Sequence, residues 1–278
     1  MSSTLPLKKR EQAVTVPQIL ARKSAGRRVT VLTAYDYPTA RLLDGVRDLD
    51  IILVGDSLGM VELGYDTTVP VTMDEMVHHS KAVRRGVRRA LVVADMPFIS
   101  YQTSEADAVR NAGRLLQEGG ANAVKLEGGA AIAPTIRRLV ECGIPVMGHI
   151  GMTPQSVNLM GWRVQGRSEE DADRILRDAI AVQESGAFAI VLELIPMDLA
   201  RRISEKLSIP TIGIGSGPSC DGQVLVISDM IALHGEDEPA YKHVRHYANV
   251  GVAIREAAEG YCRDVRAGSF PDEGESFR

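Results

Sequence analysis

Eight short apolar runs, rich in Val, Ile and Leu, recur along the chain. They cover residues 29–35, 50–55, 90–95, 123–127, 145–149, 189–193, 210–215 and 223–227. Strands that are buried on both faces of a parallel sheet have this continuous apolar character, whereas half-exposed strands alternate apolar and polar residues. The pattern therefore predicts eight buried strands.

Helix-like segments separate the runs, and the clearest of them begin with capping signals. Thr72 and Glu75 have the spacing of a capping box, and Ser104 and Ser168 stand before acidic residues, as N-cap residues do. About eight strand–helix units, with no linker or shift in composition, predict one closed parallel (β/α)8 barrel, a TIM barrel, with its helices outside. A doubly wound open sheet is the alternative.

The two ends of the chain extend this picture. Thr15 and Gln18 form another capping-box spacing, which predicts a short helix ending near Gly26, before the first strand and placed to cover the bottom of the barrel. Residues 268–278 are polar and carry Pro and Gly. We expect a single barrel domain over residues 1–278, with a core at about 28–262 and a polar tail at about 268–278.

Composition and charge narrow the class of protein. With 45% hydrophobic and 24% charged residues the chain has the balance of a globular protein with a sizeable core. A net charge of -4 supplies no field for holding nucleic acid or anionic lipid, and no apolar segment approaches the ~20 residues of a membrane span. Small-molecule partners are therefore the default. The three cysteines are far apart and lack paired or metal-ligand spacing, which favours the reducing cytoplasm.

Polar residues capable of chemistry follow most of the predicted strands at their C-terminal ends. In a parallel barrel these ends lie on one face, which is the face that carries active sites. The residues are Tyr35, Asp56, Ser57, Asp95, Lys125, Glu127, His149 and Glu193.

Asp56, Asp95 and Glu127 end consecutive strands, which lie about 4.8 Å apart, so their carboxylates can converge. Clustered acids repel one another unless a cation neutralises them. An all-oxygen set with open positions suits Mg²⁺, whereas zinc usually recruits His or Cys. The alternative is that each acid only caps a helix or lies in a surface loop.

Lys125 points to the same side of its strand as Glu127, because Leu126 stands between them. A barrel lysine raises the possibility of Schiff-base chemistry, but a lysine beside several acids should stay protonated and bind a carboxylate, assisted by Ser57. A structural ion pair with Glu127 is the alternative. His149 is either a proton shuttle or a structural hydrogen-bond partner, and Tyr35 either contacts the substrate or packs at the rim.

Eight segments occur in a characteristic order and spacing: TAYDYPTA, VGDSLGM, GYDTTVPVTMDEM, ADMPF, VKLEGG, PVMGHIGMTPQS, the stretch from Gly161 to Glu169, and GIGSGPSCDGQVLV. As a group they resemble the ketopantoate hydroxymethyltransferase (3-methyl-2-oxobutanoate hydroxymethyltransferase) family, and the resemblance runs from about Val14 to about Tyr261. The chain departs from the expected pattern at Met160 and Trp162, which affects loop packing and folate contacts and leaves the strand-end residues in place.

The resemblance implies a (β/α)8 barrel, a homodecamer of two pentameric rings, and a step of pantothenate biosynthesis. It implies one Mg²⁺ per subunit, held by Asp56, Asp95 and Glu127. The oxo-acid substrate would contact Asp56, Ser57, Asp95 and Lys125, and Glu193 would be the proton acceptor.

The implied reaction moves a hydroxymethyl group from 5,10-methylenetetrahydrofolate to 3-methyl-2-oxobutanoate, giving 2-dehydropantoate through a Mg-stabilised enolate. The alternative is another Mg-dependent enzyme that enolises oxo acids, of the phosphoenolpyruvate mutase or isocitrate lyase type, although the KKCGH-type loop of those enzymes is absent from this sequence. A metal-binding scaffold without catalysis is a further alternative.

Glu193 is the one carboxylate in the apolar run AIVLELIP. On the sixth strand of eight it would lie across the barrel mouth from Asp56 on the second strand, which favours a base facing the substrate over a metal ligand. The alternative is a strand-end glutamate paired with an arginine.

Overall fold

The computed structural model describes residues 13–234 and 241–277. The chain divides into two compact units, Met1–Val224 and Leu225–Arg278. The first unit carries the strands, apart from Leu225 at the end of the eighth, and all the candidate site residues from Tyr35 to Glu193. In the second, helix α10 spans Ile227–Met230, helix α11 spans Val250–Ala267 and the 3-10 turn η3 spans Glu273–Glu275. The single-domain expectation for residues 1–278 stays a prediction.

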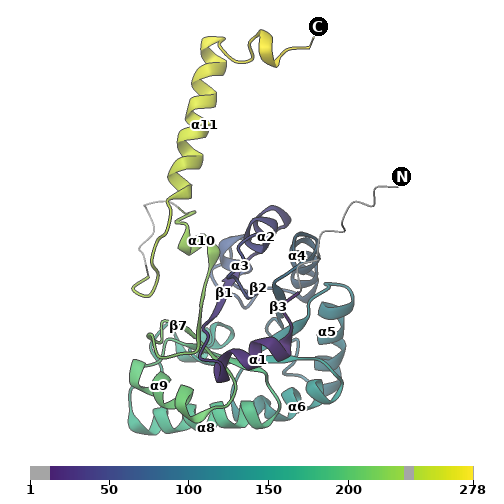
Figure 1. Cartoon of the computed structure of the whole chain (residues 1–278), viewed down its shortest axis with the longest axis vertical. Coiled ribbons are helices and arrows are strands. Elements are labelled where there is room, and N and C mark those ends of the chain that lie inside the picture. The colour runs from purple at the N-terminus through teal and green to yellow at the C-terminus, as the bar shows by residue number, and fades with distance from the viewer. Residues whose placement is uncertain (1–12, 235–240, 278) are drawn as a thin grey trace, which may run out of the picture. The chain divides into compact units, whose positions relative to one another are not determined.

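Eight parallel strands close into a barrel in chain order, β1 to β8, as Figure 1 shows in part. This confirms the (β/α)8 barrel, and the doubly wound alternative is wrong. Each strand overlaps one apolar run, and the fifth extends two residues further than its run. The strands are β1 Val29–Thr33, β2 Ile51–Val54, β3 Leu91–Asp95, β4 Ala123–Glu127, β5 Val146–Gly151, β6 Ala189–Glu193, β7 Thr211–Ile214 and β8 Gly222–Leu225.

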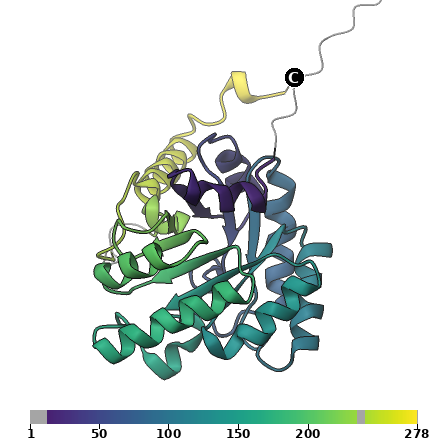
Figure 2. The same ribbon diagram turned by 60° about the horizontal axis from the view of Figure 1, so that its bottom comes forward.

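Helices connect the strands and lie outside them, coloured from blue to green in Figure 2. The predicted caps are present: the Thr72 side chain accepts from the Glu75 backbone, and Ser104 and Ser168 cap their helices in the same way. The helices of the first unit are α1 Val16–Ser24, α2 Tyr37–Asp44, α3 Leu58–Val61, α4 Met73–Gly86, α5 Glu105–Gln117, α6 Ala133–Glu141, α7 Val157–Met160, α8 Glu169–Glu184 and α9 Met197–Lys206, with 3-10 turns η1 Ala130–Ile132 and η2 Pro154–Ser156.

Helix α1 covers the bottom of the barrel, as predicted. Ile19 is fully buried in the core cluster formed by side chains inside the barrel. Arg22 pairs with Asp50, just before β2, and Lys23 Nζ lies 2.6 Å from Oδ2 of Asp221, just before β8. Both acids stand at the N-terminal ends of strands, so α1 is tied to the end of the barrel opposite the predicted site.

Strand register brings the polar residues of neighbouring strands to one level at the other end, the mouth. Asp95 stands beside Lys125 in the β3–β4 pair, and Glu127 stands beside His149 in the β4–β5 pair. In the β5–β6 pair Gly151 stands beside Glu193. The two longest connections predicted from the sequence also leave from this end, after β2 and β5, and each holds short helical turns.

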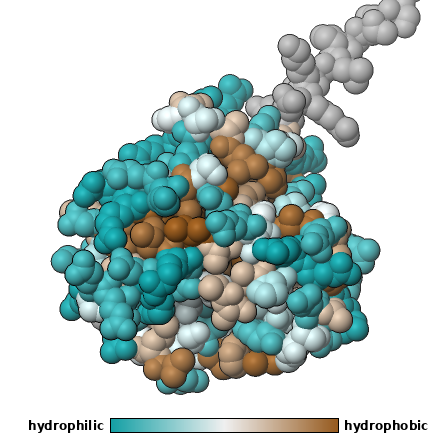
Figure 3. All heavy atoms as spheres, turned by 90° about the horizontal axis from the view of Figure 1, so that it is seen from below, coloured by the Kyte–Doolittle hydropathy of each residue, from teal (hydrophilic) through white to brown (hydrophobic). Residues whose placement is uncertain are grey.

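Among the described residues, no helix combines the length and the apolar character that crossing a membrane requires. The face shown in Figure 3 is hydrophilic over most of its area, with separate apolar patches between.

Candidate active site

Asp56, Asp95 and Glu127 lie together at the barrel mouth. Their relative exposures are 3%, 3% and 6%. Asp95 Oδ2 accepts a hydrogen bond of 3.0 Å from the Asp56 backbone. Burial raises the pKa of Asp56 well above its usual value, and the negative charges of Asp95 and Glu127 raise it further. The structure thus brings the three predicted acids close enough to repel one another.

Lys125 carries the positive charge nearest to these acids. Its Nζ lies 3.1 Å from Asp95 Oδ1, so its ion pair is with Asp95 and not with Glu127, the partner considered from the sequence. Burial by itself lowers the pKa of Lys125, but the negative charges of Asp95, Glu127 and Asp56 outweigh it and hold the pKa above its ordinary value. A lysine held in its charged form is a poor nucleophile, which disfavours Schiff-base chemistry.

His149 connects this group to Glu193. Its Nδ1 lies 3.4 Å from Glu127 Oε1, and its Nε2 lies 3.1 Å from Glu193 Oε2, but neither contact is aligned as a hydrogen bond. The Glu193 side chain is 15% exposed, whereas His149 is 3% exposed. Glu193 is therefore the more open member of a chain of contacts that runs from the buried acids toward the mouth.

The protonation of His149 follows from its neighbours. Burial and the charge of Lys125 lower its pKa, but contacts with Glu127 and Glu193 outweigh both and raise the pKa to about 9. Nδ1 also lies 3.1 Å from Lys125 Nζ, an approach that suits a neutral ring accepting from the lysine. We favour the protonated ring, because a carboxylate stands beside each ring nitrogen.

Tyr35 reaches the site through Ser57. The Tyr35 hydroxyl lies 2.8 Å from Ser57 Oγ, and the tyrosine is 1% exposed. A Cβ added at Gly55 would lie 2.7 Å from Ser57 Oγ and 3.6 Å from Asp95 Oδ2. Gly55 thus gives the Ser57 hydroxyl the space that it occupies beside Asp95.

Two buried residues of the site were missed in the sequence. Gln155, on η2, donates from Nε2 to Asp56 Oδ2 over 2.7 Å, and Tyr101 donates to Gln155 Oε1 over 2.8 Å. Both lie in connections that follow strands, which is a signal that could have found them. The residue types themselves, a neutral amide in Gln155 and a phenol in Tyr101, do not indicate a metal-binding or catalytic site.

The residues at the mouth fit a hard divalent cation by the chemistry of their donors. In the described ranges, no group of three or more His, Cys, Asp or Glu stands in a ready-made metal-ligand arrangement. The acids are turned instead toward Lys125 and Gln155. Yet Asp95 Oδ1 and Glu127 Oε1 are buried and, within the same ranges, have no hydrogen-bond partner. Buried carboxylate oxygens in this condition are suitable ligands for Mg²⁺.

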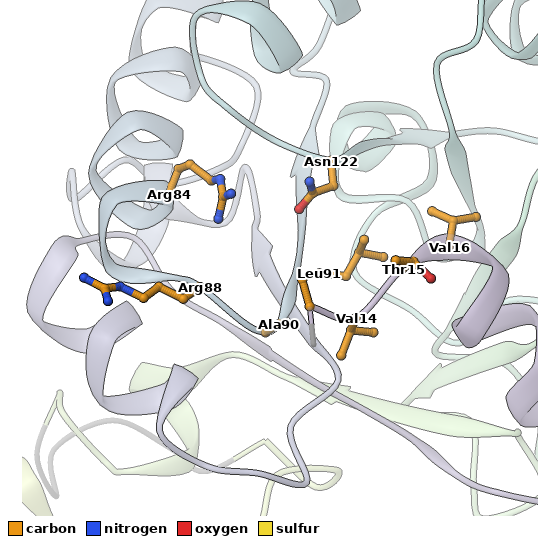
Figure 4. A pocket seen from close by; sticks show the side chains of 9 residues that line it. Val14, Thr15, Val16, Arg84, Arg88, Ala90, Leu91 and Asn122 are labelled. Carbon is orange, nitrogen blue, oxygen red and sulfur yellow. The ribbon is translucent and has the colours of Figure 1, made fainter. Parts of the chain in front are cut away.

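A cavity of about 240 Å³ lies at the other end of the barrel, between the residues before α1 and the starts of β3 and β4. Figure 4 shows Val14, Arg84, Arg88 and Leu91 among its lining residues. Because Leu91 is the first residue of β3, this cavity is at the bottom and does not include the clustered acids.

Comparison with known sequences identifies a family. The family described as ketopantoate hydroxymethyltransferase matches residues 13–273. A 3-methyl-2-oxobutanoate hydroxymethyltransferase from Moorella thermoacetica is 60% identical over 266 residues, which is 95% of this chain and 98% of that protein. One from Trichlorobacter lovleyi is 59% identical over 265 residues, again 95% of this chain and 98% of the relative.

Solved structures with the same fold are more distant in sequence. A phosphonopyruvate hydrolase in complex with oxalate and Mg²⁺ has a TM-score of 0.61 at 12% identity, covering 94% of this chain and 93% of that chain. A 2,3-dimethylmalate lyase of the phosphoenolpyruvate mutase/isocitrate lyase superfamily has a TM-score of 0.60 at 16% identity, covering 95% and 89%. At such identities the likeness shows a shared fold and carries no argument for a shared reaction.

Proposed function

The chain belongs to the ketopantoate hydroxymethyltransferase family, and from this premise we propose that it transfers a hydroxymethyl group from 5,10-methylenetetrahydrofolate to 3-methyl-2-oxobutanoate. The product is 2-dehydropantoate, in pantothenate biosynthesis. The observation that carries the site assignment is the arrangement at the mouth: a partly exposed carboxylate, Glu193, is joined through His149 to buried acids and a charged lysine.

Lys125 and Ser57 bind the carboxylate of the oxo acid in this proposal. The ammonium group is buried and charged, and an ion pair with a substrate carboxylate is stronger in such a water-poor site than at the surface. The Ser57 hydroxyl is held in place by Tyr35, so Tyr35 acts through Ser57. Binding through the carboxylate end fixes the orientation of the oxo group and of C3.

Asp56, Asp95 and Glu127 would hold one Mg²⁺ per subunit, and Asp56 and Asp95 would thereby also face the substrate. When bound, the ion supplies a Lewis acid for the oxo group, which makes the C3–H bond of the substrate more acidic. The two buried carboxylate oxygens without hydrogen-bond partners support this assignment.

Glu193 accepts the proton from C3. His149 lies 3.1 Å from Glu193 Oε2 and serves as an auxiliary group, whose charge in the protonated form holds the Glu193 carboxylate in position. C3 then forms a bond to the one-carbon unit of the folate. Water provides the hydroxyl oxygen of the new hydroxymethyl group, and tetrahydrofolate leaves.

Deuterium exchange at C3 of 3-methyl-2-oxobutanoate tests this proposal, with and without Mg²⁺ and with and without folate. We expect exchange that requires a divalent cation and proceeds without folate, since proton removal precedes carbon–carbon bond formation. Exchange by the wild type in the presence of a chelator would contradict the metal assignment. Exchange at the wild-type rate in Glu193→Gln would contradict the assignment of the base.

Membership of the family adds two expectations about the whole protein. We propose that the chain assembles as a homodecamer of two pentameric rings and that it acts in the cytoplasm. Sedimentation equilibrium of the purified full chain measures its mass, and a monomeric mass at micromolar concentration would contradict the decamer.

A further inference from the structure

Gln155 lies in the connection after β5, and its side chain has polar contacts to several elements of the mouth. The residue is 4% exposed. Its Nε2 donates to Asp56 Oδ2 over 2.7 Å and to the Met96 carbonyl over 2.9 Å. Its Oε1 accepts from the Tyr101 hydroxyl over 2.8 Å, and its backbone N–H donates to Glu127 Oε2 over 3.0 Å. One buried residue therefore holds the acids that follow β2 and end β4.

The orientation of the Gln155 amide is determined by these contacts. A backbone carbonyl oxygen can only accept, so the NH₂ group must be the end that faces Met96. The second hydrogen of that NH₂ group is then directed to Asp56, and the amide oxygen is left for the Tyr101 hydroxyl. Turning the amide over would place two acceptors together at Met96 and leave the NH₂ group without its carboxylate.

The three acids share one pattern of hydrogen bonding. One oxygen of each accepts from an N–H group: Asp95 Oδ2 from the Asp56 backbone, and Asp56 Oδ2 and Glu127 Oε2 both from Gln155. In the part of the chain that the structure describes, Asp95 Oδ1 and Glu127 Oε1 accept no aligned hydrogen bond. Asp95 Oδ1 faces the Lys125 ammonium at 3.1 Å, and Glu127 Oε1 faces His149 Nδ1 at 3.4 Å. A carboxylate that is held by one oxygen thus has its other oxygen fixed in direction, toward a position where a cationic group already lies.

We propose that Gln155 is a positioning residue of the cation site, which fixes Asp56 through its side chain and Glu127 through its backbone. The inference deepens the proposed function and depends on it only in that Asp56, Asp95 and Glu127 hold Mg²⁺. A neutral donor suits this position, because a fourth carboxylate would add to the repulsion and a cationic side chain would compete with the metal for the acids.

Titration of Mn²⁺ and Mg²⁺ into the metal-free full chain, followed by calorimetry, measures the effect of Gln155→Met. This change retains the length of the side chain and the backbone N–H to Glu127, and it removes the donor to Asp56. Gln165→Met is the matched control. Gln165 is 8% exposed and lies in the same connection, but its Nε2 donates to the Arg163 carbonyl and not to an acid.

We expect Gln155→Met to weaken the affinity for the cation by about 10- to 100-fold, the usual effect of removing a group that orients a metal ligand. Gln165→Met should bind the cation as the wild type does. In steady-state assays, excess Mg²⁺ should restore the activity of Gln155→Met, which it would not do for a general structural defect. Wild-type affinity in Gln155→Met would overturn the proposal.

If Gln155→Met does not fold, as judged by circular dichroism, Gln155→Asn keeps an amide with a shorter reach, and the same titration decides. A wild type that binds the cation but performs no hydroxymethyl transfer, with weaker cation binding in Gln155→Met, would overturn the proposed reaction and support the positioning role. A wild type that binds no divalent cation would overturn both the metal assignment and this inference.

Discussion

Acids lie at both ends of the barrel, but at one end each acid has a cationic partner of its own, and at the other end the acids share their partners. At the bottom, Asp50 pairs with Arg22 of helix α1. Asp221 accepts from Lys23 and from both the backbone and the hydroxyl of Thr211. These acids tie α1 and the strand starts together, and their charges are compensated within the chain.

At the mouth the balance is different. Asp56, Asp95 and Glu127 share Lys125, and the protonated His149 lies beside Glu127 and Glu193. Two of the buried oxygens accept no aligned hydrogen bond from the described residues. Burial and mutual repulsion raise the pKa of Asp56, whereas the bottom acids have cationic partners of their own. Compensated acids at the bottom therefore stabilise the fold, while the incompletely compensated acids at the mouth are suited to an external ligand.

The matched substitutions Asp56→Asn and Asp50→Asn should show the largest difference between the mouth and the bottom of the barrel. Asp56→Asn should abolish Mg²⁺-dependent C3 exchange, and it should leave the metal-free chain as stable as the wild type or about 1 kcal/mol more stable, because it removes a repelled buried charge. Asp50→Asn should lower the free energy of unfolding by about 2 kcal/mol and leave exchange unchanged. Exchange assays and urea unfolding in a chelator measure the two effects.

A loss of stability in Asp50→Asn, and none in Asp56→Asn, is the decisive result for that pair. If Asp56→Asn destabilises the metal-free chain more than Asp50→Asn does, the mouth acids are structural and the contrast between the two ends is wrong.

Glu193→Gln should slow C3 exchange by about 10²- to 10⁴-fold, the range for removal of a general base. Cation affinity should stay at its wild-type value, since Glu193 contacts His149 and no contact with the three clustered acids is expected from its strand. Exchange rates and calorimetric titration separate the base from the metal ligands. A loss of cation binding in this variant would place Glu193 in the cation site.

The pH dependence of stability should report on His149. Its pKa is about 9 in the folded chain and ordinarily 6.5, so the folded state binds the proton more tightly. This stabilisation is complete below about pH 6.5 and is lost as the pH rises toward 9, a decrease of about 3 kcal/mol. Urea unfolding of the metal-free chain at several pH values measures it. His149→Gln should flatten the profile, and an equal slope in that variant would assign the effect to other groups.

The smallest expected difference between the two ends of the barrel is in the effects of alanine at Gly222 and at Gly55. A Cβ at Gly222, at the start of β8, would lie 2.4 Å from the Val29 carbonyl oxygen, so Gly222→Ala should destabilise the chain by about 1–3 kcal/mol. Gly55→Ala would instead displace the Ser57 hydroxyl and raise the KM for the oxo acid by about tenfold, with little loss of stability. Thermal unfolding and steady-state kinetics of both variants test this. Equal effects on both measurements would remove the distinction between the ends.

Local signals in the sequence were sufficient to predict the strands and several of the helix starts. The apolar runs marked all eight strands, and Thr72, Ser104 and Ser168 marked helix starts that the structure confirms. The positions of Asp95 and Glu127 at the ends of their strands also followed from the runs, and so did their meeting at one mouth. The metal and catalytic roles of the mouth residues stay predictions.

Contacts between distant segments were beyond the reach of the sequence. Gln155 forms hydrogen bonds with Asp56, which is 99 positions away in the sequence, and with Met96, which is 59 positions away. No pattern in the sequence around a neutral glutamine predicts such partners. For the same reason the ion-pair partner of Lys125 is Asp95, 30 positions away on the neighbouring strand, and not Glu127 two positions along its own.

The sequence by itself determined the barrel and the end of it at which each acid lies, because strand direction and strand ends are local properties of the apolar runs. Only the tertiary structure decided which acids are compensated. Asp50 and Asp221 each receive a cation from α1. Asp56, Asp95 and Glu127 instead share Lys125, the His149 ring and the amide of Gln155. That difference depends on side chains that arrive from other segments, and it separates the acids that stabilise the fold from those available to a ligand.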